Sequence, residues 1–139
     1  MTNAEAIVRA YYAAFDACDT EAFLALLTDD VAHDLSQGPR QFGREVFRAF
    51  MAHMNRCYRE RIADLVILTD PSGIRAAAEF IVHGTYIATD PGVPGGTAAA
   101  RGQAYVISAG AFFTLRDGRV ARISNHYNLD DWVAQVNGE

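Results

Sequence analysis

The residues of this chain that could do chemistry gather around one acidic segment. Asp34 stands near the end of a short apolar run, Val31 to Leu35, and a loop rich in Gly, Pro, Ser and Gln follows at 36–43. In an apolar cavity desolvation raises the pKa of a carboxyl group, which suits it to take a proton from carbon. Asp34 is therefore predicted to be either a general base or a cap of the turn that follows it.

Three further polar residues could contact the oxygen of a substrate. Tyr11 lies on the apolar stripe of the first predicted helix, so it is either a hydrogen-bond donor or a core residue. Asn125 and Tyr127 share one face of the last predicted strand with Ile123. A buried Asn must be hydrogen-bonded, so Asn125 is predicted to contact either substrate or a buried backbone group or water.

The apolar residues that could line a pocket also have the spacing of a core. On the helix predicted from Arg44 to about Asn55 they recur at positions i, i+3, i+4 and i+7, and others alternate along the predicted strands. If the sheet curves around a cavity, the core and the pocket wall are the same surface. The predicted substrate-binding residues of this kind are Phe47, Met51, Met54, Phe80 and Phe113.

The four histidines show no spacing typical of a metal site, so neither a metal nor another cofactor is predicted. His33 follows a strand alternation that points it away from Asp34, toward the surface or a dimer face. His83 and His126 are assigned to strand faces outside the cavity, and His53 to the exposed side of its helix.

Composition places the chain among globular domains. It has 139 residues, a net charge of −5 and 50% hydrophobic residues, and no basic stretch interleaved with aromatics, so nucleic-acid binding is not expected. No apolar stretch is long enough to span a membrane and no secretory leader is visible, so we predict a cytoplasmic protein. Cys18 and Cys57 are expected to be buried, reduced thiols.

The elements that position these residues form an α+β pattern, helices first and strands later. Thr2 to Glu5 has the form of a capping box, Asp19 precedes a second short helix, and Asp29 and Asp30 are expected to close it. We predict one domain, 1–139, in which a curved antiparallel or mixed sheet wraps around three N-terminal helices, followed by a short C-terminal helix. The predicted strands after the third helix are Tyr58–Thr69, Ile74–Thr89, Gln103–Arg116 and Val120–Leu129.

The order and spacing of several short motifs resemble a known family. The motifs are the segments 16–23 and 29–34, Gly43, the hairpin 116–120 and the segment 127–132. Together they resemble the nuclear-transport-factor-2-like (NTF2-like) cone fold, in its ketosteroid-isomerase-related and SnoaL-like polyketide-cyclase branch.

This resemblance implies a cofactor-free isomerase or cyclase that removes a proton α to a carbonyl group of a small apolar, ring-bearing substrate. Asp34 would be the base and Tyr11 the donor to the enolate oxygen. A second acid of the ketosteroid isomerases would fall near Ala111, where this chain has none; one such donor is worth about 10²–10³ in rate. The alternative is a non-catalytic module that binds an apolar molecule.

The resemblance also implies a homodimer that forms through the outer sheet face. The residues expected on that face are Arg75, Glu79, Ile81 and His83.

Overall fold

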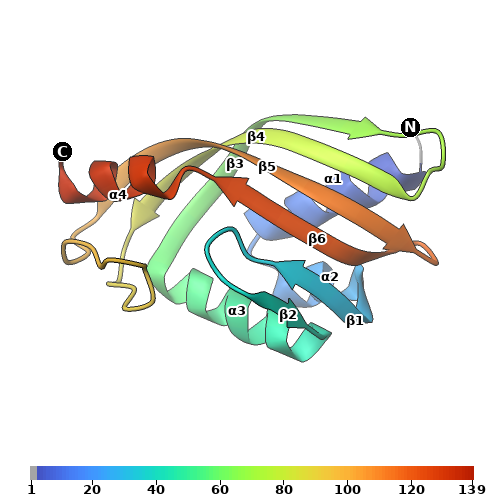
Figure 1. The fold of residues 1–139 in the computed structure, drawn as a ribbon, viewed down its shortest axis with the longest axis horizontal. Coiled ribbons are helices and arrows are strands. Elements are labelled where there is room, and N and C mark those ends of the chain that lie inside the picture. Colours follow the sequence, from blue (N-terminus) through green and yellow to red (C-terminus); the bar gives the residue numbers. More distant parts are fainter. Residues whose placement is uncertain (1–2) are drawn as a thin grey trace.

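The computed structural model describes residues 3–139, so the predicted cap residue Thr2 lies outside the described part. Four helices and six strands follow one another along the chain (Figure 1). In order they are α1 Asn3–Asp16, α2 Thr20–Ala25, β1 Leu27–Asp34, β2 Arg40–Phe42, α3 Arg44–Cys57, β3 Tyr58–Thr69, β4 Arg75–Tyr86, β5 Gln103–Arg116, β6 Arg119–Tyr127 and α4 Leu129–Asn137.

A single curved sheet in the strand order β2-β1-β6-β5-β4-β3 organises these elements. β1 pairs with β6 in parallel, and every other neighbouring pair among the described strands is antiparallel. The long strands arch over α1 and α3, while α4 lies at one end of the sheet beside the loop that follows β4 (Figure 1). The predicted α+β cone with a mixed sheet is confirmed.

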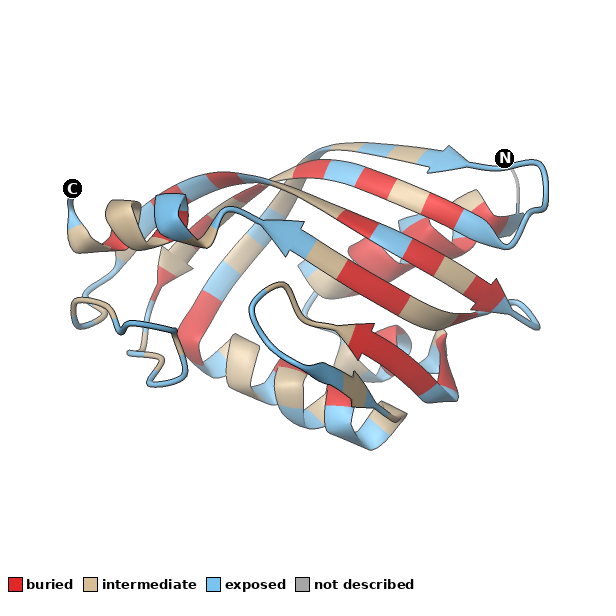
Figure 2. Cartoon of the chain, in the orientation of Figure 1, coloured by how far each residue is buried: buried red, intermediate tan, exposed pale blue. Residues whose placement is uncertain are grey.

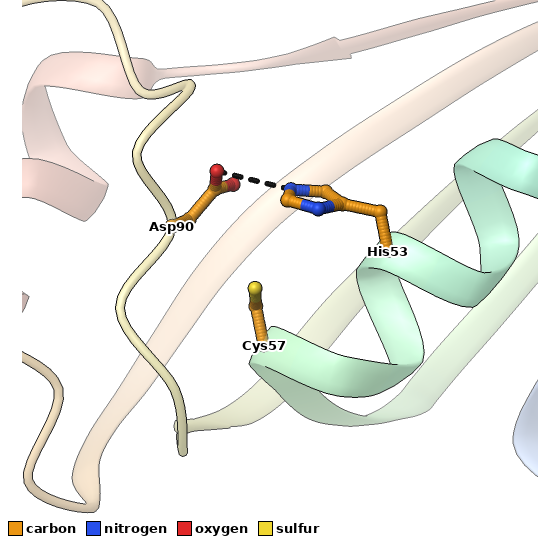
Figure 3. A group of neighbouring side chains, drawn as sticks. All are labelled: His53, Cys57 and Asp90. Carbon is orange, nitrogen blue, oxygen red and sulfur yellow. Dashed lines mark ion pairs between the residues drawn. The ribbon is translucent and has the colours of Figure 1, made fainter.

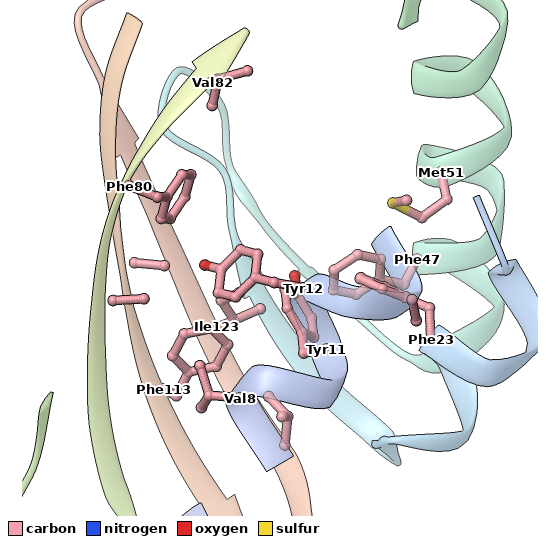
Figure 4. Packing of buried hydrophobic residues seen from close by; sticks show 14 of the residues in the cluster. Val8, Tyr11, Tyr12, Phe23, Phe47, Met51, Phe80, Val82, Phe113 and Ile123 are labelled. Atoms are coloured by element: carbon pink, nitrogen blue, oxygen red, sulfur yellow. The ribbon is translucent and has the colours of Figure 1, made fainter. Parts of the chain in front are cut away.

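Burial alternates along the long strands as a half-covered sheet requires (Figure 2). On β4, Ala76, Ala78, Phe80 and Val82 are buried, whereas Glu79 on the opposite face is exposed. The predicted core face of this strand is therefore confirmed. The concave face and α1 together bury the main aromatic cluster (Figure 4).

The predicted ends of several elements were wrong for identifiable reasons. Asp29 and Asp30 do not close a helix but lie inside β1, because the strand starts at Leu27 and the N–H of Val120 donates to the carbonyl of Leu26 at 2.8 Å. β4 stops at Tyr86, since the next N–H, at Ile87, donates to the carbonyl of Cys57 at 2.9 Å.

The end of β6 and the burial of one cysteine also differ from the prediction. β6 ends before Asn128 because this residue caps α4, its side chain accepting a hydrogen bond from the N–H of Asp131 at 3.1 Å. Cys57 is buried as expected, but Cys18 is exposed, in a left-handed position between α1 and α2.

None of the helices in the described part of the chain combines the length and apolar character needed to cross a membrane.

One glycine on the concave face is required by a close approach of two strands. Gly84 pairs with Glu60 on β3 and with Tyr105 on β5. The ring of Tyr105 crosses the backbone at Gly84, and a Cβ atom there would lie only 2.2 Å from the ring carbons. This path lets the Tyr105 hydroxyl donate to Oε2 of Glu60 at 2.5 Å, two strands away.

We predict that Gly84→Ala lowers the free energy of unfolding by about 1–3 kcal/mol, the usual cost of overpacking a core. The added methyl group must push the Tyr105 ring off the strand. Urea denaturation followed by circular dichroism measures the change. Gly38→Ala is the control, because its Cβ would meet the end of the flexible Leu35 side chain, at 3.2 Å. Equal stability of both variants would contradict the close-packing argument.

Candidate functional site

A cavity of about 360 Å³ opens between the concave face of the sheet, α1, α3 and the loop after β4. Its volume lies in the range of small-molecule sites, and most of its wall is apolar or aromatic. Seven of the residues predicted to act on or bind a substrate line it: Tyr11, Phe47, Met51, Met54, Phe80, Asn125 and Tyr127. Their contact with a substrate stays a prediction.

Asp34, the predicted base, is not among the residues that line this cavity. Its Oδ2 accepts hydrogen bonds from Arg40 at 2.9 Å and from Arg122 at 3.0 Å, and its Oδ1 accepts another from Arg40. These bonds, from Arg40 first, outweigh the effect of burial and lower the pKa of Asp34. The expectation that Asp34 projects into the cone was wrong, because arginines on both neighbouring strands hold its carboxylate on the other side of β1.

His33 takes the inward position instead, and it is 2% exposed. Its ring stacks on Phe47 with centroids 4.1 Å apart and meets the ring of Phe50 edge-on at 4.8 Å. Burial lowers the pKa of His33 to about 4, although the charge of Asp34 opposes this. The imidazole is therefore neutral at physiological pH, and the prediction that His33 faces the surface was wrong.

The hydrogen bonds of His33 fix which of its ring nitrogens carries the proton. The amide nitrogen of Asn125 lies 3.1 Å from Nε2. An amide nitrogen can only donate, so Nε2 accepts and the proton resides on Nδ1. Nδ1 is buried and has no hydrogen-bond partner among the described residues. A residue that lines the cavity therefore carries a buried N–H donor without a partner.

A second uncompensated donor comes from α1. Tyr12 lines the cavity, and its hydroxyl is buried without a hydrogen-bond partner in the described part of the chain. Its ring lies 4.9 Å from that of Phe80, between α1 and β4 (Figure 4). Burial raises the pKa of Tyr12 far above its ordinary value, so the phenol stays protonated. Tyr11 also lines the cavity, and burial followed by the influence of Tyr12 raises its pKa in the same way.

Phe113, which was predicted to bind substrate, is fully buried but does not line the cavity. Its ring packs edge-on against Tyr11 at 5.3 Å and against Tyr12 at 6.0 Å (Figure 4). It therefore supports the two tyrosines, which do line the cavity.

Two carboxylates that were not predicted line the cavity, and their environments differ. Glu60 accepts a hydrogen bond from Tyr105, but burial outweighs this bond and raises the pKa of Glu60. Asp90 accepts from the Tyr58 hydroxyl at 2.6 Å, from the N–H of Gly92 at 2.8 Å and from His53 at 3.0 Å. Burial alone would raise the pKa of Asp90, but these hydrogen bonds together lower it.

In the described part of the chain, one group of three side chains offers donor atoms suited to a metal ion (Figure 3). The donor atoms of His53, Cys57 and Asp90 all lie within 4.8 Å of one another. Nε2 of His53 already contacts Asp90, and its Nδ1 lies 2.9 Å from a guanidinium nitrogen of Arg56. Because Nε2 of His53 already pairs with Asp90 and the positive Arg56 guanidinium lies beside the same ring, we assign the group to anchoring the loop after β4. His53 is half-buried here, contrary to its predicted exposure.

Sequence reasoning could have found part of this site. Val31 and His33 share a strand face, so the buried Val31 already indicates that His33 points inward. Tyr58, Glu60 and Ile62 alternate in the same way on β3. The placement of Asp90 had no such signal, because it depends on how a long loop folds back onto α3.

Comparison with known proteins identifies the family. Residues 8–123 match the SnoaL-like domain, so the chain belongs to the SnoaL-like branch of the NTF2-like superfamily, as the sequence motifs indicated. A comparison with curated proteins gave no match.

Several solved structures are similar to this chain. One from Pseudomonas putida KT2440 is described as a "putative polyketide cyclase"; it has 57% sequence identity, 98% of each chain is covered and the TM-score is 0.91. One from Xanthomonas campestris pv. campestris with the same description has 48% identity, 96% coverage of each chain and a TM-score of 0.91.

A more distant structure shows the fold alone. An epoxide hydrolase of the LEH-like type from Mycobacterium tuberculosis shares 16% identity, with 96% of this chain and 89% of that chain covered and a TM-score of 0.74.

We predict that the neutral state of buried His33 makes stability depend on pH. The unfolded chain takes up a proton on His33 near pH 6.5, but the folded protein does so only near pH 4. Between these values the unfolded state binds more protons, so the free energy of unfolding falls as the pH falls, by about 2–3 kcal/mol.

Urea denaturation of wild type and His33→Gln at pH 4 to 7 isolates this contribution. The variant should show a shallower slope, while His83→Gln, on the outer face of β4, should keep the slope of the wild type. An unchanged slope in His33→Gln would rule out a buried, neutral His33.

Proposed function

We propose that this protein is a cofactor-free isomerase or cyclase that removes a proton α to a carbonyl group of a small apolar, ring-bearing substrate. The size and apolar wall of the cavity support such a substrate. The polar groups in the wall are acid–base and hydrogen-bonding groups: carboxylates, phenols, imidazoles, amides and a serine hydroxyl. The description of the structures at 48% and 57% identity as "putative polyketide cyclase" agrees with proton-transfer chemistry on ring systems.

The observation that carries the proposal is the pair of buried donors without partners, the Tyr12 hydroxyl and Nδ1–H of His33. Leaving a buried donor unpaired costs about 1–3 kcal/mol, so each such group needs an explanation. A carbonyl or enolate oxygen of a bound molecule would supply the missing acceptor. Hydrogen-bond donors placed where negative charge develops stabilise an enolate.

The alternative function is a non-catalytic module that binds an apolar molecule. The position of Asp34 outside the cavity and the absence of an acid at Ala111 favour this alternative. Uncompensated donors inside an apolar wall would equally help such a module to bind an oxygen-containing ligand. The two functions differ in whether a bound ketone loses a proton, which an exchange experiment measures directly.

We further propose that the protein forms a homodimer through the outer face of the sheet and acts in the cytoplasm. Val106 and Phe112 on β5 are each 51% exposed, and a partner on this face would cover them. We predict that sedimentation equilibrium shows a dimer and that Phe112→Glu dissociates it. A monomeric wild type would contradict this proposal.

For the site itself we predict a preference for ligands that carry oxygen. 2-Naphthol, which mimics the enol of a ring ketone, should bind more tightly than naphthalene, which fills the same space but accepts no hydrogen bond. Tyr12→Phe should weaken 2-naphthol binding about 5–10-fold, the value of one hydrogen bond, and leave naphthalene binding unchanged.

Ligand fluorescence titrations of both proteins with both compounds measure these affinities. The naphthalene titration is the control for the shape of the cavity. The same ratio of affinities in wild type and Tyr12→Phe would show that the Tyr12 hydroxyl does not meet the ligand oxygen.

A further inference from the structure

We propose that Glu60 is the catalytic residue that transfers the proton, and that Tyr105 is the positioning residue that orients its carboxylate. This inference rests on the proposed function and names the base that it requires. Neither residue is identified by the sequence motifs of the family, and the carboxylate that those motifs suggested, Asp34, lies outside the cavity.

The position of Glu60 is fixed by the strand alternation of β3. Tyr58, Glu60 and Ile62 lie on one face of this strand, and all three line the cavity. Tyr105 engages Oε2 of Glu60 at 2.5 Å, and no described residue donates a hydrogen bond to Oε1. A carboxylate with one oxygen held and the other uncommitted has a defined direction and a free lone pair, as a general base needs.

The contact between Tyr105 and Glu60 requires a glycine at position 84. Tyr105 reaches Glu60 only because Gly84, on the strand between them, has no side chain, since a Cβ atom would lie 2.2 Å from the Tyr105 ring. The same ring packs edge-on against Trp132 of α4 at 5.8 Å, which fixes its orientation. Tyr105 is itself 2% exposed, so the hydrogen bond is shielded from water.

The groups around Glu60 explain why it would hold a proton more readily than the other carboxylate of the cavity. Tyr105 from β5 donates to it, and Tyr127 from the end of β6 is close enough for Glu60 and Asp90 to raise its pKa further, after burial. Asp90 carries three hydrogen-bond donors, including His53 of α3, which keep it ionised. Two carboxylates in one cavity, one pushed toward protonation and one held as an anion, divide naturally into a proton shuttle and a fixed charge.

The remaining titratable groups are less suited to the role. The Nε2 lone pair of His33 is occupied by the Asn125 amide, and its Nδ1 carries a proton. Tyr11 and Tyr12 stay protonated because burial raises the pKa of both. His126 also lines the cavity, contrary to its predicted place outside it, and its Nε2 lies 3.1 Å from the Ser124 hydroxyl. Of the two carboxylates in the wall, Glu60 is thus the one that combines a free lone pair with a tendency to accept a proton.

The chemical step needs no further reactant. A carboxylate oxygen of Glu60 takes the proton from the carbon α to the carbonyl group, the C–H electron pair forms the carbon–carbon double bond of the enolate, and the carbonyl π electrons move to oxygen. That oxygen accepts a hydrogen bond from Tyr12, His33 or Tyr127, which line the same cavity. Protonated Glu60 then returns its proton to carbon, at the same atom or at another.

The test is hydrogen–deuterium exchange at carbon 1 of 2-tetralone in D2O, followed by proton NMR. 2-Tetralone is an apolar bicyclic ketone whose enol resembles 2-naphthol, so it reports proton removal without knowledge of the physiological substrate. Wild type should accelerate exchange above the buffer rate. Glu60→Gln should lose at least about 100-fold of this acceleration, the lower end of general-base catalysis.

Two controls accompany this variant. Asp117→Asn removes an exposed carboxylate from the turn between β5 and β6 and should exchange like wild type. Naphthalene should bind Glu60→Gln as it binds wild type, which shows that the cavity is intact.

Tyr105→Phe tests the positioning role through the pH midpoint of the exchange rate, which a purely structural role of Tyr105 would leave unchanged. The hydrogen bond from the Tyr105 hydroxyl lowers the pKa of Glu60. Loss of this bond in the variant should therefore shift the pH midpoint of the exchange rate to higher pH, while most of the maximal rate is retained. A midpoint that stays in place would overturn the positioning role.

The outcomes separate the two proposals. If wild type accelerates exchange and Glu60→Gln does so equally, Glu60 is not the base, and the proposed function stands with another residue. If wild type binds 2-tetralone but leaves its exchange at the buffer rate, both the inference and the proton-transfer function are overturned in favour of a binding module.

Discussion

Desolvation on the concave side of the sheet is the constraint on which the rest of the structure depends. The sheet curls around α1 and α3, so polar groups that point inward leave water without gaining a full set of partners. The consequence depends on the group: His33 stays neutral, Tyr12 stays protonated, and the pKa of Glu60 is raised. A surface with the same residues would have none of these properties.

A network of tyrosine hydroxyls supports this arrangement at the open end of the cavity. Tyr58 donates to Asp90, Tyr105 donates to Glu60, and the hydroxyl of Tyr86 accepts from the N–H of Asp90 at 2.8 Å. The rings of all three tyrosines pack around Trp132 of α4, with centroids 5.3–5.8 Å away. The C-terminal helix therefore stabilises both the loop after β4 and the orientation of the carboxylates, although α4 contributes few residues to the cavity wall itself.

Much of the fold could be predicted from sequence because the long strands follow a period of two. β3 and β5 have the predicted bounds, and the buried face of β4 was assigned correctly. The site was harder. The acidic run 29–34 was aligned with the family by its residue types, and this alignment placed Asp34 inside the cavity. The arginines that hold Asp34 on the other side of β1 come from β2 and β6. Their positions depend on strand register. The Tyr105–Glu60 contact likewise requires the three-strand register at Gly84, which no local pattern reveals.

The most direct test of this account is the protonation state of Glu60 in the ligand-free protein. Carbon-13 NMR of protein labelled at the glutamate carboxyl carbons, with the resonance assigned by its loss in Glu60→Gln, gives the titration curve of this one group. The account predicts a pKa above the ordinary glutamate value of 4.5. A pKa at or below that value would show that Glu60 is well solvated or strongly paired, and would contradict the claim that the cavity prepares this carboxylate for proton transfer.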